Sequence, residues 1–251
     1  MGTILELRKL SVWFESISAV NEVDLAVPEG KIMTIIGPNG AGKTTVLNSI
    51  SGLVKPAGGS VLFRGEDVTG FSPHHLSLKG IGRSFQQNNV FFNLPVWENV
   101  RLAAQAHGRD NWKFYRTARS FPDYGKTAET ALTKVDLVRQ AHRRASFLSQ
   151  GGLRRLELAI LLATSPILLL MDEPLAGVAD GDIPALTTII SNLRKEGRTI
   201  LWVEHKMDQV LALSDEILVM DHGEAIALGS PGVIAADERV RTAYLGRDKD
   251  E

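Results

Sequence analysis

A glycine-rich loop between a strand-like run and a helix-like run constrains this sequence more than any other feature. The strand-like residues 31–36 lead into the loop, and a helical pattern follows it over residues 44–53. The loop reads Gly37-Pro38-Asn39-Gly40-Ala41-Gly42-Lys43-Thr44-Thr45. It fits the pattern G-x-x-x-x-G-K-[ST], in which backbone amides and the helix N-terminus form a concave site for phosphate. A chance match is the alternative, and the flanking strand and helix argue against it. The loop therefore predicts nucleotide binding.

Side chains around this loop supply the chemistry of a nucleotide site. Lys43 can reach the β- and γ-phosphates, and the Thr44 hydroxyl can ligate Mg²⁺. Residues 167–171 form a continuous apolar run, as expected of a strand buried on both faces, and end at Asp172 and Glu173. Asp172 can hold Mg²⁺ beside the loop, and Glu173 can orient and deprotonate a water that attacks the γ-phosphate. The alternative for this acidic pair is a solvated turn.

Composition narrows the class of protein further. The chain has 251 residues, of which 44% are hydrophobic and 23% charged, with no cysteine. It therefore has no disulfide framework, cysteine zinc site or thiol nucleophile. The 28 basic and 29 acidic residues give a net charge of −1, which makes no case for bulk nucleic-acid binding. The most apolar stretch, residues 158–171, is interrupted by Thr164-Ser165-Pro166 and is too short to cross a membrane. These features are typical of a soluble cytoplasmic protein.

The order of strand-like and helix-like runs predicts an α/β fold. The first third reads as short strands at residues 5–14, 20–27 and 59–63. After Gln150, strands at 167–171, 199–203 and 216–220 alternate with helices from about Asp182 and Lys206, which indicates a mainly parallel sheet. Residues 88–147 show helical spacing instead. Residues 113–155 contain 10 Lys and Arg against 3 Asp and Glu. This basic helical segment is interpreted as an insertion in the α/β core.

From residue 5 to residue 246, the chain resembles an ATP-binding-cassette (ABC) ATPase, the motor subunit of ABC transporters. Besides the phosphate loop and the acidic pair, four motifs carry the resemblance: Arg83-Ser84-Phe85-Gln86, Leu148-Ser149-Gln150-Gly151-Gly152, Leu175-Ala176-Gly177-Val178-Ala179-Asp180 and Glu204-His205. The second motif departs from the usual LSGGQ at Gln150 and Gly152, and the third has Ala179 where Asp is usual. The resemblance implies one cassette domain over residues 1–251. Its core would be a mainly parallel P-loop NTPase (RecA-like) sheet at 1–87 and 165–251, with an antiparallel N-terminal β-subdomain. Residues 88–164 would form an inserted α-helical subdomain.

The resemblance also implies residue roles. Gln86 would approach Mg²⁺ and the attacking water, and His205 would contact the γ-phosphate. Ser149 and Gly151 would close over ATP bound to Lys43 of a second subunit. Phe14 would stack on adenine; Trp13 could do so instead, or both could be core residues. Glu173, His205 and Gln86 are thus the expected catalytic residues, with ATP and Mg²⁺ as cofactors.

A narrower similarity points to ATPase subunits of bacterial branched-chain amino-acid importers and the related urea and amide importers. It rests on Ala176-Gly177, Glu204-His205 and Arg241-Thr242-Ala243-Tyr244-Leu245-Gly246. Such systems imply transmembrane permease subunits, a like or unlike second ATPase subunit in a head-to-tail dimer, and indirectly a periplasmic solute-binding protein, with no nucleic acid. The chain would lie in the cytoplasm, peripheral on the inner face of the cell membrane.

Several aromatic and basic residues of the sequence fit more than one role. The aromatic residues Phe91, Phe92 and Trp97 could line a groove for the permease's coupling helix or belong to a local core. The basic residues Arg139, Arg143 and Arg144 could face anionic headgroups or lie on a solvated helix face. Two other functions also compete with transport. One is a non-transport ABC ATPase acting on DNA or ribosomes; the other is a small-molecule kinase with the same phosphate loop.

Overall fold

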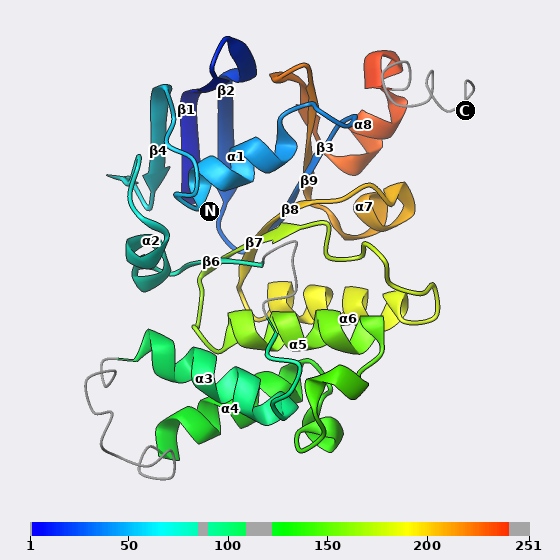
Figure 1. Cartoon of the computed structure of the whole chain (residues 1–251). Helices are drawn as coiled ribbons and strands as arrows, with labels where there is room; N and C mark the ends of the chain where they lie inside the picture. The colour runs from blue at the N-terminus through cyan, green and yellow to red at the C-terminus, as the bar shows by residue number, and fades with distance from the viewer. Residues whose placement is uncertain (1, 85–89, 109–121, 241–251) are drawn as a thin grey trace.

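The computed structural model describes residues 2–84, 90–108 and 122–240. At its centre is a six-stranded sheet with the order β10-β9-β3-β8-β7-β6, in which all neighbours are parallel except β10 and β9 (Figure 1). Its strands are β3 (Ile32–Ile36), β6 (Ile81–Arg83), β7 (Leu168–Asp172), β8 (Thr199–Val203), β9 (Glu216–Asp221) and β10 (Glu224–Gly229). Every residue of β3, β7 and β8 is buried. This burial is expected of parallel strands covered on both faces, and it confirms the mainly parallel core.

The two faces of this sheet belong to different hydrophobic cores. Leu168 and Leu170 of β7 lie in one core together with residues of helix α1 (Lys43–Ile50). Leu169 and Met171 point the other way, into a core that contains residues of α5 (Gln150–Leu162) and α6 (Ile183–Lys195). Because strand side chains alternate between faces, β7 separates α1 from α5 and α6.

A second, antiparallel sheet is built from the N-terminal part of the chain. It has the order β2-β1-β4-β5. Its strands are β1 (Thr3–Phe14), β2 (Ile17–Pro28), β4 (Gly58–Phe63) and β5 (Glu66–Asp67). Buried residues of β1, β2 and β4 share their core with α1, so this sheet and the six-stranded sheet cover opposite sides of that helix. The predicted antiparallel N-terminal strands are confirmed.

Helices occupy the segment that interrupts the α/β pattern. They are α3 (Val96–His107) and α4 (Pro122–Lys134), followed by 3₁₀ turns at Val138–Gln140 and Ala145–Phe147. Buried residues of α3 and α4 share one core with α5, and the three helices lie together below the sheet in Figure 1. Helical spacing of the apolar residues had predicted that this segment forms helices.

The remaining helices are α2 (Pro73–Lys79), α7 (Met207–Leu213) and α8 (Pro231–Ala236). Predicted boundaries shift by one to three residues. Helix α1 ends at Ile50 because the chain turns at Gly52, where φ is +73°. Helix α6 begins at Ile183 with Asp182 as its N-cap, and α7 begins at Met207. Among the helices of the described ranges, none is both long and apolar enough to span a bilayer.

Candidate functional site

The glycine-rich loop joins the end of β3 to the start of α1, and its glycines are required by geometry. Gly42 has φ +95°, and a Cβ at this position would lie 2.4 Å from the carbonyl oxygen of Ala19. At Gly37, with φ +153°, a Cβ would lie 2.2 Å from the carbonyl oxygen of Met220. No larger residue fits either position without moving main chain. The loop is therefore fixed against β2 and β9.

Lys43 is the first residue of α1, and its amine turns back over the loop. The side chain is buried, and Nζ donates hydrogen bonds to the carbonyl oxygens of Gly37 (2.7 Å) and Pro38 (2.8 Å). Burial lowers the pKa of Lys43, while the negative charges of Glu173 and Asp172 oppose this shift. A cation thus lies close to both acidic residues, as the sequence predicted.

Asp172 ends β7 with its side chain fully buried. Its Oδ1 accepts a long hydrogen bond from Thr44 Oγ1 (3.4 Å), and its Oδ2 pairs with the Arg83 guanidinium (3.3 Å). The same guanidinium donates to Ser51 Oγ at the end of α1 (2.6 Å). Burial raises the pKa of Asp172, and the charge of Arg83 opposes this shift. Arg83 begins the motif at residues 83–86, but the sequence did not predict its contact with Asp172.

The oxygen atoms of Thr44 and Asp172 fit a magnesium ion, which prefers hard oxygen ligands. Protein ligands are few here, since the described residues contain no group of three His, Cys, Asp or Glu that could hold a metal. Mg²⁺ usually binds through one or two protein oxygens together with phosphate and water oxygens. The donor set therefore suits a metal that arrives with a nucleotide.

Glu173 and His205 meet at the ends of two adjacent strands. Asp172 of β7 and Val203 of β8 are register partners, so the residues beyond them are neighbours. The Glu173 amide donates to the carbonyl oxygen of Val203 (2.9 Å), and Glu173 Oε1 lies 2.9 Å from His205 Nε2. Glu173 has φ +49°, a left-handed conformation that is costly for a residue with a Cβ. The structure thus brings together Lys43, Thr44, Asp172, Glu173 and His205.

Other predicted site residues lie apart from this group. Ser149 is the N-cap of α5, and its Oγ accepts a hydrogen bond from the Gly152 amide (3.1 Å). Gly151 follows in the same helix, where a Cβ would lie 2.3 Å from Asp182 Oδ2. Helix α5 packs on the face of the six-stranded sheet opposite to α1. Ser149 and Gly151 are therefore separated from Lys43 of the same chain.

The aromatic candidates differ in their burial. Trp13 and Phe14 are 52% and 48% exposed, so the idea that both are core residues is wrong. Phe91 and Phe92 are exposed as well, whereas Trp97 is partly buried and packs against the core of the helices. Trp97 thus belongs to the local core, and the two phenylalanines are on the surface.

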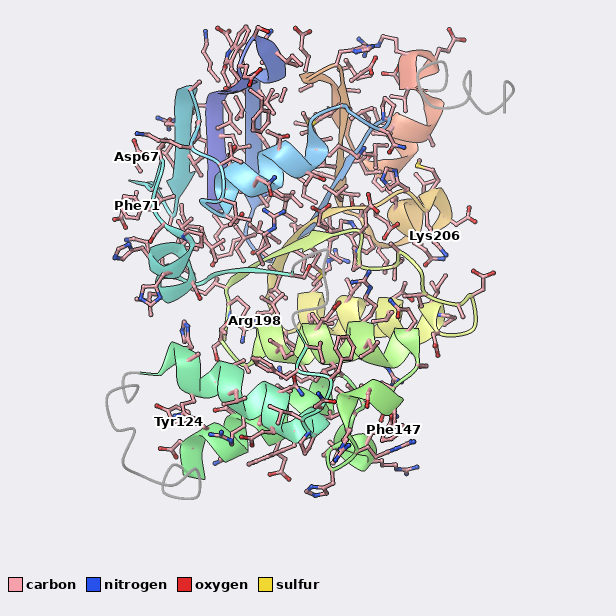
Figure 2. All side chains as sticks on the ribbon, in the orientation of Figure 1. Asp67, Phe71, Tyr124, Phe147, Arg198 and Lys206 are labelled. Atoms are coloured by element: carbon pink, nitrogen blue, oxygen red, sulfur yellow. The ribbon has the colours of Figure 1, made fainter. Side chains whose placement is uncertain are left out.

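Two further predictions concern the region around the helices. Gln86 lies outside the described residues. Arg139, Arg143 and Arg144 are exposed, and they lie in or beside the short 3₁₀ turns between α4 and α5 and not on the face of an α-helix. Phe147, which belongs to the second of these turns, is also exposed (Figure 2).

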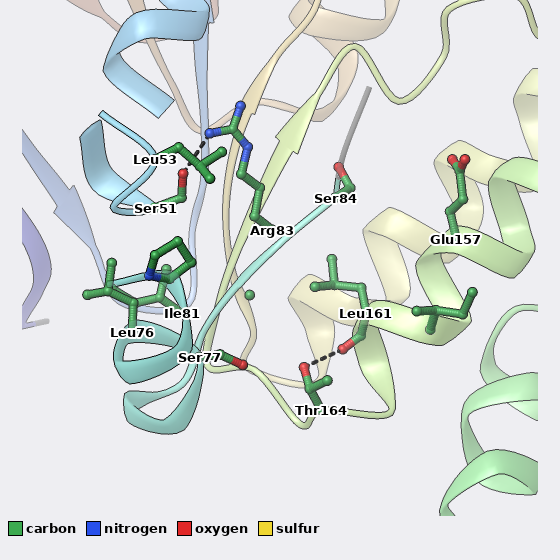
Figure 3. Close-up of a pocket in the computed structure, with 13 residues that line it drawn as sticks. Ser51, Leu53, Leu76, Ser77, Ile81, Arg83, Ser84, Glu157, Leu161 and Thr164 are labelled. Atoms are coloured by element: carbon green, nitrogen blue, oxygen red, sulfur yellow. Dashed lines mark hydrogen bonds between the residues drawn. The ribbon is translucent and has the colours of Figure 1, made fainter. Parts of the chain in front are cut away.

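A cavity that the sequence did not indicate lies between α2, β6 and α5 (Figure 3). It has a volume of about 270 Å³. Leu76 and Leu161 are among its apolar lining residues, and Arg83 and Glu157 are the charged ones. Since Arg83 also pairs with Asp172, the cavity is adjacent to the acidic end of β7.

A phosphate-binding loop between a buried strand and a helix, close to an acidic pair at the end of a parallel strand of the same sheet, defines the class of P-loop ATPases. Comparison with known proteins agrees. The sequence pattern of the ABC transporter family matches residues 20–176. The chain is 37% identical to the high-affinity branched-chain amino acid transport ATP-binding protein BraF of Pseudomonas aeruginosa, over 97% of this chain and 98% of BraF. It is 35% identical to a probable branched-chain amino acid transport ATP-binding protein, LivG, of Archaeoglobus fulgidus, over 99% of this chain and 97% of LivG.

Solved structures lead to the same family. The crystal structure of the ADP conformation of an ATP-binding cassette of an ABC transporter superposes with a TM-score of 0.89 at 31% identity, covering 98% of this chain and all of that one. A dimeric post-hydrolysis cassette bound to ADP and phosphate gives a TM-score of 0.77 at 26% identity, over 91% of this chain and 99% of that one. The chain belongs to the ABC transporter family as an ATP-binding ATPase subunit. This membership argues against the small-molecule kinase.

Proposed function

We propose that this chain is the ATP-hydrolysing motor of an ABC importer for branched-chain amino acids or a related small polar solute of the urea or amide type. The observation that carries the solute class is the near full-length similarity to branched-chain amino acid transport ATP-binding proteins, at 35% and 37% identity. The relatives are transport proteins, which favours transport over a role on DNA or ribosomes.

In this proposal the loop residues 37–45 bind the phosphates of ATP. Lys43 Nζ exchanges its contacts with Gly37 and Pro38 for phosphate oxygens, because a charge-assisted hydrogen bond to an anion is stronger than one to a carbonyl. Thr44 and Asp172 hold Mg²⁺ through their oxygen atoms, and Gln86 joins them. Phe14 is sufficiently exposed to stack on adenine.

Glu173 and His205 carry the hydrolysis step. A Glu173 carboxylate oxygen accepts a proton from the attacking water, and His205 Nε2 lies within 2.9 Å of Glu173 Oε1, where it can orient both water and γ-phosphate. Gln86 assists by holding the water. The bound metal ion supplies charge that stabilises the phosphate oxygens during transfer.

A second ATPase subunit completes the site. The separation of α5 from α1 supports a head-to-tail dimer in which Ser149 and Gly151 of one subunit face ATP on Lys43 of the other. Amides at the start of α5 suit an anion. Light scattering of Glu173→Gln with Mg-ATP distinguishes the partners: a doubled mass means a like subunit, and an ATP-bound monomer means an unlike one.

The partners proposed beyond this dimer are transmembrane permease subunits and, through them, a periplasmic solute-binding protein. The chain works at the cytoplasmic face of the membrane, attached through the permeases. Exposed Phe91 and Phe92 support a permease contact on the helical side, and Arg143 and Arg144 support a nearby anionic headgroup surface.

Uptake of radiolabelled solutes tests the solute class. Cells that lack this chain are supplied with the wild type, with Lys43→Ala, or with the surface control Lys55→Ala, and uptake of leucine, urea and acetamide is measured. The wild type and Lys55→Ala should restore uptake of one of these solutes, and Lys43→Ala should not. If uptake of all three solutes is independent of the chain, the proposed solute class is wrong.

A further inference from the structure

Glu204 is an acidic residue that the proposed hydrolysis step does not use, yet it is almost completely buried. It directly follows β8, and only 2% of the residue is exposed. Its Oε1 accepts hydrogen bonds from the amides of His205 (2.8 Å) and Lys206 (3.2 Å). Its Oε2 accepts one from the amide of Leu175 (3.3 Å). One carboxylate thus holds two separate segments of the chain.

These two segments carry the two residues that the proposal assigns to hydrolysis. Leu175 is two positions beyond Glu173, in the segment that follows β7. His205 is the second residue of the segment that follows β8. The register of β7 and β8 ends at Asp172 and Val203, and one further backbone hydrogen bond, from the Glu173 amide to the Val203 carbonyl oxygen (2.9 Å), follows it. Beyond it, side chains join the two segments: Glu173 contacts His205, Glu204 accepts from the Leu175 amide, and Lys206 Nζ lies 3.6 Å from Oδ1 of the exposed Asp180.

We propose that Glu204 is a positioning residue that fixes His205 Nε2 relative to Glu173 Oε1. A buried carboxylate is costly unless its oxygens are hydrogen-bonded, and here backbone amides satisfy both of them. Those amides belong to the two segments, so the carboxylate that accepts from both of them sets their separation. The inference rests on the proposed function, because it presupposes that Glu173 and His205 act on water and phosphate.

Two variants alter the carboxylate: Glu204→Gln changes its chemistry at nearly constant side-chain volume, and Glu204→Asp shortens the side chain. In Glu204→Gln, one oxygen becomes an NH₂ group that faces amide donors, so one segment loses its acceptor. In Glu204→Asp, both oxygens remain, but the side chain is one methylene too short to reach both segments. A matched control is Asp215→Asn, at the opposite ends of the parallel strands, where Asp215 accepts hydrogen bonds from the Ile32 amide (2.9 Å), Lys31 Nζ (3.2 Å) and the Arg194 guanidinium. Asp215→Asn changes a largely buried acid without touching the site.

Steady-state ATP hydrolysis is measured on the full chain. We expect Glu204→Gln to lower kcat on the order of 10²-fold, because a misplacement of about 1 Å has this effect, and to leave KM for ATP within about twofold. Glu204→Asp should give an intermediate kcat, and Asp215→Asn should keep both parameters. A wild-type kcat in Glu204→Gln overturns the inference, as does an equal loss in Asp215→Asn.

A double mutant separates positioning from a general structural role. If Glu204 acts through His205, adding Glu204→Gln to His205→Ala should lower kcat no further. An additional loss equal to that in the wild-type background overturns the inference.

Amide hydrogen exchange provides a readout that does not depend on activity. Glu204→Gln should speed exchange at Leu175 and His205, and Asp215→Asn should not. A wild-type chain that binds no ATP would contradict the proposed function, and unchanged exchange in Glu204→Gln would still overturn this inference.

Discussion

At the residue scale, the site depends on ionisable side chains that are buried next to partners of opposite charge or next to hydrogen-bond donors. The buried Asp172 carboxylate lies between the Arg83 guanidinium and the Thr44 hydroxyl, and its charge reaches Lys43. One side chain alone would be unfavourable there, because an unpaired buried charge is strongly destabilising. The group is therefore sensitive to the loss of any single member.

A second buried pair lies beside the cavity, on helix α5. Arg154 and Glu157 are joined at 2.8 Å, with side chains 14% and 11% exposed, and Arg154 also donates to the carbonyl oxygen of Ala176 (3.4 Å). Burial raises the pKa of the Glu157 carboxyl, although the hydrogen bond and charge of Arg154 lower it. The pair links α5 to the segment that follows Glu173.

This raised pKa predicts a pH dependence of stability. Above the usual carboxyl pKa of 4.5 the unfolded chain has lost a proton that the folded chain still holds at Glu157. The free energy of unfolding should therefore fall as pH rises through the window from 4.5 to the raised value. Glu157→Gln keeps an acceptor for Arg154 but cannot titrate, so this part of the fall should disappear in urea titrations at a series of pH values. Identical pH slopes in the two proteins would contradict the assignment.

At the element scale, the strand–loop–helix unit of β3 and α1 owes its shape to residues without side chains. Positive φ angles at Gly37, Gly40 and Gly42 turn the backbone, and Gly37 and Gly42 also pass within contact distance of other main chain. This is why the pattern could be read from the sequence alone. A continuous apolar run also predicted β7, because a strand covered on both faces needs no polar positions on alternate residues.

Short elements and long-range contacts could not be predicted in this way. Strand β6 has only three residues and shows no periodicity. Arg83 meets Asp172 across 89 positions of the sequence, and Glu204 meets Leu175 across 29. Such pairs come from the order of strands in the sheet, which local patterns do not specify. Ser72 and Pro73 did offer a helix-start signal for α2.

Substitution of the loop glycines tests the element directly. Gly30→Ala, in the turn before β3, has φ +74° and no atom within 4 Å of the new Cβ, so it should cost about 1–2 kcal/mol of unfolding free energy. Gly42→Ala should cost a further 1–3 kcal/mol, about what overpacking adds, because its Cβ would overlap the Ala19 carbonyl. Urea unfolding gives both values. If Gly30→Ala and Gly42→Ala lower the unfolding free energy equally, the close approach of Gly42 to β2 does not constrain the loop.

At the scale of the whole molecule, the six-stranded sheet divides the site in two. The phosphate loop and α1 pack on one face, and α5 with Ser149 and Gly151 packs on the other. Under the proposed function, these two parts are halves of an ATP site that lie on different faces of the sheet, as a head-to-tail dimer requires. The Arg154 contact with Ala176 connects the α5 half to the segment beyond Glu173.

The proposed function requires this chain to bind ATP on the loop of residues 37–45 and to hydrolyse it through Glu173. The most direct test is phosphate release from Mg-ATP by the wild type and by Glu173→Gln, with ATP binding measured on the same samples. We expect both proteins to bind ATP, and Glu173→Gln to hydrolyse it roughly 10²–10⁴-fold more slowly, the range expected when a general base is lost. Wild-type hydrolysis by Glu173→Gln, or no ATP binding by the wild type, would contradict the proposed function.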